Sequence, residues 1–332
     1  MIFWETVLAC LFFELLSLSK LGAKRRGWCL VAFVLLPTGW MTSTIMGQDD
    51  SIATCGILLP LVVYLHGHRR LALLLSGIGV VAAKLFVIFE LFTLIPITTP
   101  RAKWRDRATD ALLGFGPIIL VYGALSLFRI KHHYPLPLVG FKPDQYFGTN
   151  FWIVLHRYAN LQFPPIATYI GVLSLLAALI PVVLLTRLAP KDRLPTTICA
   201  ALGGSLLCFF MLFYHVGPEY FMIAVPALLI SSTNLGDALC CIFLSIIPWA
   251  GKFFQNAAFM YRAGESTGKA VALQAFQRIF HSSPETWLWV DQILFSLLTF
   301  YMCYRWCRKL TPSQASFTDP INPSREEVTA QA

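Results

Sequence analysis

Two neighbouring carboxylates, Asp49 and Asp50, offer the first chemistry that the sequence suggests. They stand in Gly47-Gln48-Asp49-Asp50, between two long apolar runs. Paired carboxylates can hold a divalent cation through their oxygens, or take a proton from a hydroxyl as a general base. Because Asp is favoured just before a helix, both also suit the N-terminal cap of the apolar segment that starts at Ser51. We predict catalytic roles for Asp49 and Asp50, with a divalent cation as a candidate ligand.

A lysine, Lys84, interrupts the apolar stretch from Leu71 to Ile97. A cation inside such a stretch is costly to bury, so its presence favours a functional role. Its compact ammonium group suits contact with the phosphate of a lipid carrier. The structural alternative is an ion pair with Glu90 or Glu14. We predict that Lys84 binds substrate.

The short polar segment His215 to Tyr220 is a third candidate site, because it forms a turn between two apolar runs. His215 and Glu219 carry groups that can contact a polar ligand, and the ring of Tyr220 can stack on a sugar. The alternative is a polar turn with an interfacial aromatic anchor. We predict that all three residues contribute to a substrate site.

The elements that position these residues are apolar, because 57% of the 332 residues are hydrophobic and only 13% are charged. A soluble domain of this length could not bury so much apolar surface in one core. A helix needs about 20 apolar residues to cross a ~30 Å hydrocarbon layer, and a lipid-exposed backbone must satisfy its own hydrogen bonds. The predicted fold class is therefore all-α, a polytopic transmembrane protein with about 11 spans.

The spans form one predicted transmembrane domain, residues 1–305, followed by a polar segment, 306–332, which we predict to be a disordered cytoplasmic tail. The runs 71–83, 86–99 and 237–250 are short for spans, so each is tilted, re-entrant or buried in protein. The predicted spans are 3–19, 28–46, 52–66, 71–83, 86–99, 109–128, 164–187, 195–214, 219–233, 237–250 and 285–305.

Basic clusters set the predicted orientation, because under this span count they all fall on one side. That side is then cytoplasmic, with the N-terminus outside and the C-terminus inside, in a bacterial plasma membrane or a eukaryotic endoplasmic reticulum. The net charge of +9 lies in short loops rather than in a binding stripe, which excludes a nucleic-acid partner. The clusters are Lys24 to Arg26, His66 to Arg70, Arg101 to Arg107, Lys191 to Arg193 and Arg305 to Lys309.

In their order along the chain, several motifs resemble those of the polyprenyl-phosphate-dependent glycosyltransferases with the GT-C fold. The resemblance covers residues 28–235 and is greatest to the bacterial mannosyltransferase-like branch and to the catalytic subunit of the first GPI mannosyltransferase. The matching motifs are Gly47-Gln48-Asp49-Asp50-Ser51, His68-Arg69-Arg70, Gly77 and Gly79, Ala83-Lys84, and His215 to Phe221 with Pro226.

The resemblance implies a GT-C-like membrane hexosyltransferase that works on the non-cytoplasmic face. Its partners would be a lipid-phosphate sugar donor and membrane lipid, and it would transfer a hexose such as mannose to a lipid or glycan acceptor. An acid would deprotonate the acceptor hydroxyl while basic residues stabilise the departing lipid phosphate. Lys84 fits the second role, and Glu219 or Tyr220 would line the acceptor site.

The N-terminus departs from the family pattern, in which a first span and an acidic external loop come before the matched region. This chain starts at the equivalent of the second span, so the usual acid has no counterpart. The explanations are a truncated gene model, a second chain that supplies the acidic loop, a non-catalytic subunit, or Asp49 or Asp50 acting as the acid. A transporter or flippase of lipid-linked sugars is a further alternative, indicated by Glu14, Lys84 and Glu90 in apolar runs.

Overall fold

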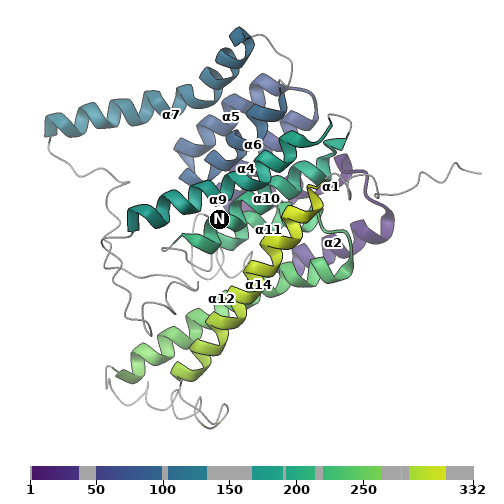
Figure 1. Cartoon of the computed structure of the whole chain (residues 1–332), viewed down its shortest axis with the longest axis vertical. Coiled ribbons are helices and arrows are strands. Elements are labelled where there is room, and N and C mark those ends of the chain that lie inside the picture. The colour runs from purple at the N-terminus through teal and green to yellow at the C-terminus, as the bar shows by residue number, and fades with distance from the viewer. Residues whose placement is uncertain are drawn as a thin grey trace, which may run out of the picture.

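The structure is a computed structural model that describes residues 2–36, 50–98, 104–132, 167–189, 192–213, 220–262, 278 and 284–311. Every element within these residues is a helix, which confirms the predicted all-α class (Figure 1). The α-helices are α1 (Ile2–Leu18), α2 (Ala23–Leu35), α4 (Asp50–Leu65), α5 (Arg69–Ala82), α6 (Ile88–Thr98), α7 (Trp104–His132), α9 (Ala167–Arg187), α10 (Pro195–Leu212), α11 (Phe221–Ile230), α12 (Leu235–Arg262) and α14 (Pro284–Lys309), with a 3-10 helix η2 (Leu85–Val87) between α5 and α6.

Four of the described helices are long and apolar enough to cross a membrane, which indicates a membrane protein. They correspond to Trp104–Phe128, Tyr169–Arg187, Pro195–Leu212 and Thr286–Lys309. Other apolar helices are shorter, among them Phe221–Ile230. At a rise of about 1.5 Å per residue, such a short helix cannot cross a hydrocarbon layer unaided. The number of spans and the orientation of the termini stay predictions.

The centre of the bundle is built by α10 and α11. Every residue of α11 is buried, and α10 is buried without interruption from Ile198 to Phe210. A helix that is apolar on all sides has no polar face to present to water, and here both helices are enclosed by neighbouring helices. Gly203 lets them approach closely, because a Cβ at this position would lie 2.9 Å from Leu228 Cδ2.

Several helix ends that carry predicted basic clusters contact neighbouring helices in the structure. Arg25 and Lys309 donate to the last carbonyls of α11, which lack partners within the helix itself. Further contacts join the end of α4 to α1 and the start of α5 to α7. The contacts are Arg25 with Ile230 O (3.1 Å), Lys309 with Ser231 O (3.0 Å), His66 with Glu14 (3.0 Å) and Arg69 with Asp110.

Three helices diverge from the central bundle in Figure 1: α7 projects away on one side, and α12 with α14 forms a hairpin that extends on another. Some helices also run past the predicted span ends, since α7 continues to His132 and α12 to Arg262. Hydropathy marks where an apolar run stops, but polar residues can continue a helix. For the same reason α14 continues past the predicted start of the tail at 306 and reaches Lys309, and Trp306 is fully buried.

Candidate functional site

Lys84 lies at the tip of a helical hairpin formed by α5 and α6, as the interruption of the apolar run predicted. Helix α5 ends at Ala82, and the N–H of Ala83 donates to Gly79 O at 2.9 Å. Lys84 itself is extended, with φ −144° and ψ 149°, and η2 then turns the chain into α6. The break therefore sets the lysine at the end of the hairpin rather than within a helix.

The structure brings Lys84 and Tyr220 together, although they are far apart in the sequence. The ammonium of Lys84 lies 5.1 Å from the centroid of the Tyr220 ring, within the range of a cation–π interaction. Tyr220 immediately precedes α11, so its position is fixed by the central, buried part of the bundle. Two residues that we predicted separately as substrate-binding thus lie next to each other, and their binding of substrate stays a prediction.

The start of α4 faces the same end of the hairpin. A Cβ at Gly56 would lie 3.4 Å from Val87 Cγ2 and 3.7 Å from Ala83 Cβ, so α4 packs directly against the tip. The helix begins at Asp50, about 9 Å further along its axis at 1.5 Å per residue. The partial positive charge of this helix N-terminus and the ammonium of Lys84 therefore lie at one end of the bundle.

Aromatic rings make the floor beneath Lys84. The ring of Phe86 lies 5.0 Å from Tyr220 and 5.2 Å from Phe210, and the rings of Phe209 and Phe213 are stacked at 4.8 Å. Such ring pairs gain stability beyond the area that they bury, so they form a firm apolar surface. The site therefore combines a cation with aromatic faces.

Several predicted site residues lie outside the described parts of the chain. These are Asp49, His215 and Glu219; for Asp50 the backbone is described as the first residue of α4, and its side chain is not. Among the residues that are described, no group of three or more His, Cys, Asp or Glu is placed to hold a metal ion. The catalytic roles of the aspartates and the divalent cation stay predictions.

The carboxylates that we named as structural partners for Lys84 have other contacts. Glu14 Oε1 lies 3.0 Å from His66 Nε2, and Glu90 Oε2 accepts a hydrogen bond from Ser76 Oγ at 2.9 Å. Glu14 lies near the end of α1, where α4 also ends. The structural alternative of an ion pair with either acid is therefore not supported.

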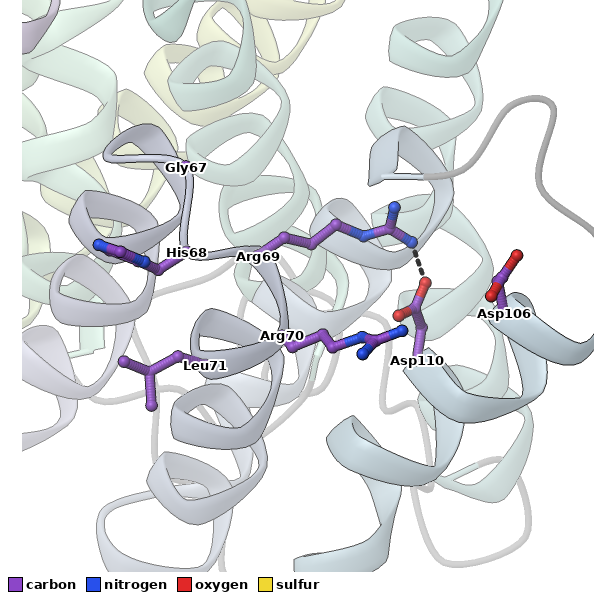
Figure 2. Close-up of a pocket in the computed structure, with 7 residues that line it drawn as sticks. All are labelled: Gly67, His68, Arg69, Arg70, Leu71, Asp106 and Asp110. Atoms are coloured by element: carbon purple, nitrogen blue, oxygen red, sulfur yellow. Dashed lines mark hydrogen bonds and ion pairs between the residues drawn. The ribbon is translucent and has the colours of Figure 1, made fainter.

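A polar cavity, which sequence reasoning missed, lies between the start of α5 and the start of α7 (Figure 2). It has a volume of about 530 Å³ and contains an ion pair between Arg69 and Asp110. The sequence showed the basic turn at Arg69 and Arg70 but did not indicate its acidic neighbours. A signal was available, because Asp110 is an acid at the beginning of a long apolar run.

Neither a family model nor a curated protein sequence matches this chain. The resemblance to the GT-C glycosyltransferases therefore stays a prediction from the sequence motifs. Of those motifs, the structure puts Lys84, Tyr220 and the beginning of α4 at one end of the bundle.

Proposed function

We propose that the chain is a GT-C-like membrane glycosyltransferase of about 11 spans that uses a lipid-phosphate-linked sugar. It takes the donor on the non-cytoplasmic face and transfers a hexose, with mannose as the leading candidate, to a lipid or glycan acceptor. The observation that carries the proposal is the approach of Lys84 to Tyr220, at 5.1 Å, beside the start of α4.

The chemistry of the end of the bundle at which Lys84 lies suits a phosphate attached to a lipid. The ammonium of Lys84 and the N-terminus of α4 both favour a negative charge. The Tyr220 ring offers a face on which a sugar can stack, and the neighbouring rings of Phe86 and Phe210 are compatible with hydrocarbon.

In the proposed reaction, Asp49 or Asp50 takes the proton of the acceptor hydroxyl as a general base. The acceptor oxygen forms a bond to the anomeric carbon of the sugar. The bond from that carbon to the phosphate oxygen breaks, and its electrons leave with the lipid phosphate. Lys84 stabilises the negative charge that develops on this leaving group.

The proposal is tested by sugar transfer in membranes that contain the chain and a lipid-phosphate-linked hexose. Lys84→Ala is expected to lower the rate about 100-fold or more, since an oriented group that stabilises developing charge contributes on that scale. The matched control is Lys24→Ala, which removes an exposed lysine from the start of α2 and should leave transfer unchanged. Equal rates for Lys84→Ala and the unsubstituted chain would contradict the proposal.

A transporter or flippase of lipid-linked sugars is the second candidate, and a specific observation favours it. Glu90 is fully buried inside the helical hairpin, and buried carboxylates in membrane proteins often belong to proton or ion pathways. Movement of a labelled lipid-linked sugar across vesicles distinguishes the two functions, because a gradient-dependent flippase would move lipid without transferring sugar. A non-catalytic subunit would neither transfer sugar nor move the lipid-linked sugar until a second chain is added.

A further inference from the structure

The polar cavity at the start of α7 has properties that the proposed transferase site does not use. It lies between two helix starts, and Gly67 to Leu71 line one side while Asp106 and Asp110 line the other. Figure 2 shows Arg69 and Arg70 extending from α5 toward the aspartates, whereas the His68 ring and the Leu71 side chain point away from them. The charged groups that face the cavity are thus two arginines and two aspartates.

One arginine and one aspartate of this set neutralise each other. Arg69 Nη2 donates to Asp110 Oδ2, and the Asp110 side chain is only 4% exposed. This pair holds its two groups to each other, because separating them would leave the buried Asp110 carboxylate without a counter-ion. Arg69 and Asp110 therefore form the inner wall of the cavity.

The other two charges, Arg70 and Asp106, are exposed and lie on opposite walls. Within the described parts of the chain, neither side chain has a hydrogen-bond or ion-pair partner. Asp106 precedes Asp110 by one helical turn, so both carboxylates share a face of α7. The cavity thus presents one available cation and one available anion, and its charges sum to zero.

The surroundings of the cavity are those of a membrane interface. It adjoins the beginning of a helix that is long and apolar enough to cross a membrane, and Trp104, the first residue of that helix, is 74% exposed. Exposed tryptophans are enriched at the level of lipid headgroups. Beyond the cavity, α7 exposes Leu112, Ile119 and Leu120, each more than 60% accessible. A polar pocket followed by an apolar wall matches the two parts of a phospholipid.

We propose that this cavity binds the headgroup of a phospholipid that carries a primary ammonium, as in phosphatidylethanolamine. Arg70 holds the phosphate, Asp106 accepts hydrogen bonds from the ammonium, and the acyl chains lie along α7. An anionic lipid fits less well, because Asp106 repels a second negative charge. A choline headgroup also fits less well, because its quaternary nitrogen has no N–H to donate to Asp106. The inference stands apart from the proposed transferase activity.

Lipid retention tests the proposal. The full chain is purified from membranes, exchanged into a mixture of equal parts of phosphatidylethanolamine, phosphatidylcholine and phosphatidylglycerol, and the bound lipids are identified by native mass spectrometry. We expect the ethanolamine lipid to be retained preferentially. Arg70→Ala should lower its retention about two- to fivefold, the effect of one lost ionic contact at an exposed site.

The sharpest variant is Asp106→Asn, which leaves the phosphate contact in place and removes the negative charge. It should lower retention of the ethanolamine lipid and raise retention of phosphatidylglycerol. Arg105→Ala is the matched control, since Arg105 is exposed on the first turn of α7 and does not line the cavity. The substituted side chains are exposed, so we expect each variant to fold normally. An unchanged unfolding temperature checks this.

Two outcomes would overturn the proposal. One is equal retention of the ethanolamine and choline lipids by the unsubstituted chain. The other is a folded Arg70→Ala or Asp106→Asn variant with unchanged lipid preference, which would make the cavity a structural ion-pair cluster only. Both readouts are independent of sugar transfer, so they are unaffected by whether the transferase proposal holds.

Discussion

The Ser76 hydroxyl donates a hydrogen bond of 2.9 Å to the Glu90 carboxylate, and both side chains are fully buried. Ser76 lies in α5 and Glu90 in α6, so this bond ties together the two legs of the hairpin that carries Lys84 at its tip. The second carboxylate oxygen, Glu90 Oε1, has no hydrogen-bond partner among the described residues. The hydrogen bond from Ser76, which we call the brace, is therefore the one side-chain hydrogen bond to Glu90 among the described residues.

The first prediction concerns this brace. Glu90→Ala leaves the buried Ser76 hydroxyl without its acceptor, and should lower the free energy of unfolding by about 1–3 kcal/mol. Glu90→Gln keeps an acceptor oxygen of the same length and should lose less. Thermal unfolding in one detergent compares the variants. A Gln variant less stable than the Ala variant would contradict this prediction, because Gln keeps an acceptor for Ser76 and Ala does not.

A second prediction follows from the close approach of α5 and α7. A Cβ at Gly77 would overlap the backbone of Gly114, so Gly77→Ala must push the helices apart. We expect a loss of about 1–3 kcal/mol, as for other overpacked sites. The control is Gly116→Ala in α7, where a Cβ would meet nothing within 4 Å. That change should be neutral or stabilising by up to about 1 kcal/mol, because Ala favours helices. Equal effects at the two glycines would argue against this packing.

The third prediction concerns the ion pairs of Asp237 near the end of α14. Asp237 Oδ1 lies 3.0 Å from Arg305 Nε, and Asp237 Oδ2 lies 2.8 Å from Lys309 Nζ. Asp237→Ala leaves the ammonium of Lys309, whose side chain is 9% exposed, without its counter-ion. The expected loss is about 3–5 kcal/mol.

The double variant Asp237→Ala with Lys309→Met removes both charges and should recover part of that loss. Unfolding free energies of the two single variants and the double variant give the coupling energy between these residues. Strict additivity would mean that the ion pair contributes no stability.

A fourth prediction tests the aromatic partner of Lys84. Tyr220→Phe keeps a ring beneath the ammonium, whereas Tyr220→Leu removes the π face that attracts it. If the proposed transferase function holds, sugar transfer should survive the Phe change and fall severalfold with Leu. A large loss with Phe would instead assign the essential role to the phenolic hydroxyl.

The sequence was enough to predict a helical membrane protein and a break at Lys84. Both conclusions depend on local properties: the length of apolar runs, and one charged residue inside a run. It also predicted that the basic clusters share one side of the membrane, because they recur at alternate ends of the runs, and this orientation stays a prediction. The site residues were chosen from the same local interruptions, and the structure unites Lys84 with Tyr220.

The tertiary structure alone decided how these elements pair. Nothing in the sequence indicated that Asp110 would neutralise Arg69, or that Arg70 and Asp106 would be left facing one cavity. Charged residues in separate segments do not show by themselves which of them will pair. The partners of Glu14 and Glu90 likewise differ from those that the sequence suggested for them. Which charged side chains pair depends on how the helices cross. The sequence of one helix does not determine that crossing by itself.

The clearest contrast is between α7 and α10, which look alike as sequences. Both are long apolar runs, yet most of α10 is buried inside the bundle while almost none of the apolar part of α7 is. Lipid and protein interior are equally apolar, so a membrane helix needs no polar face to mark which side meets its neighbours. The sequence by itself therefore determined that these segments are apolar helices, and only packing decided that α10 forms the core and α7 faces outward.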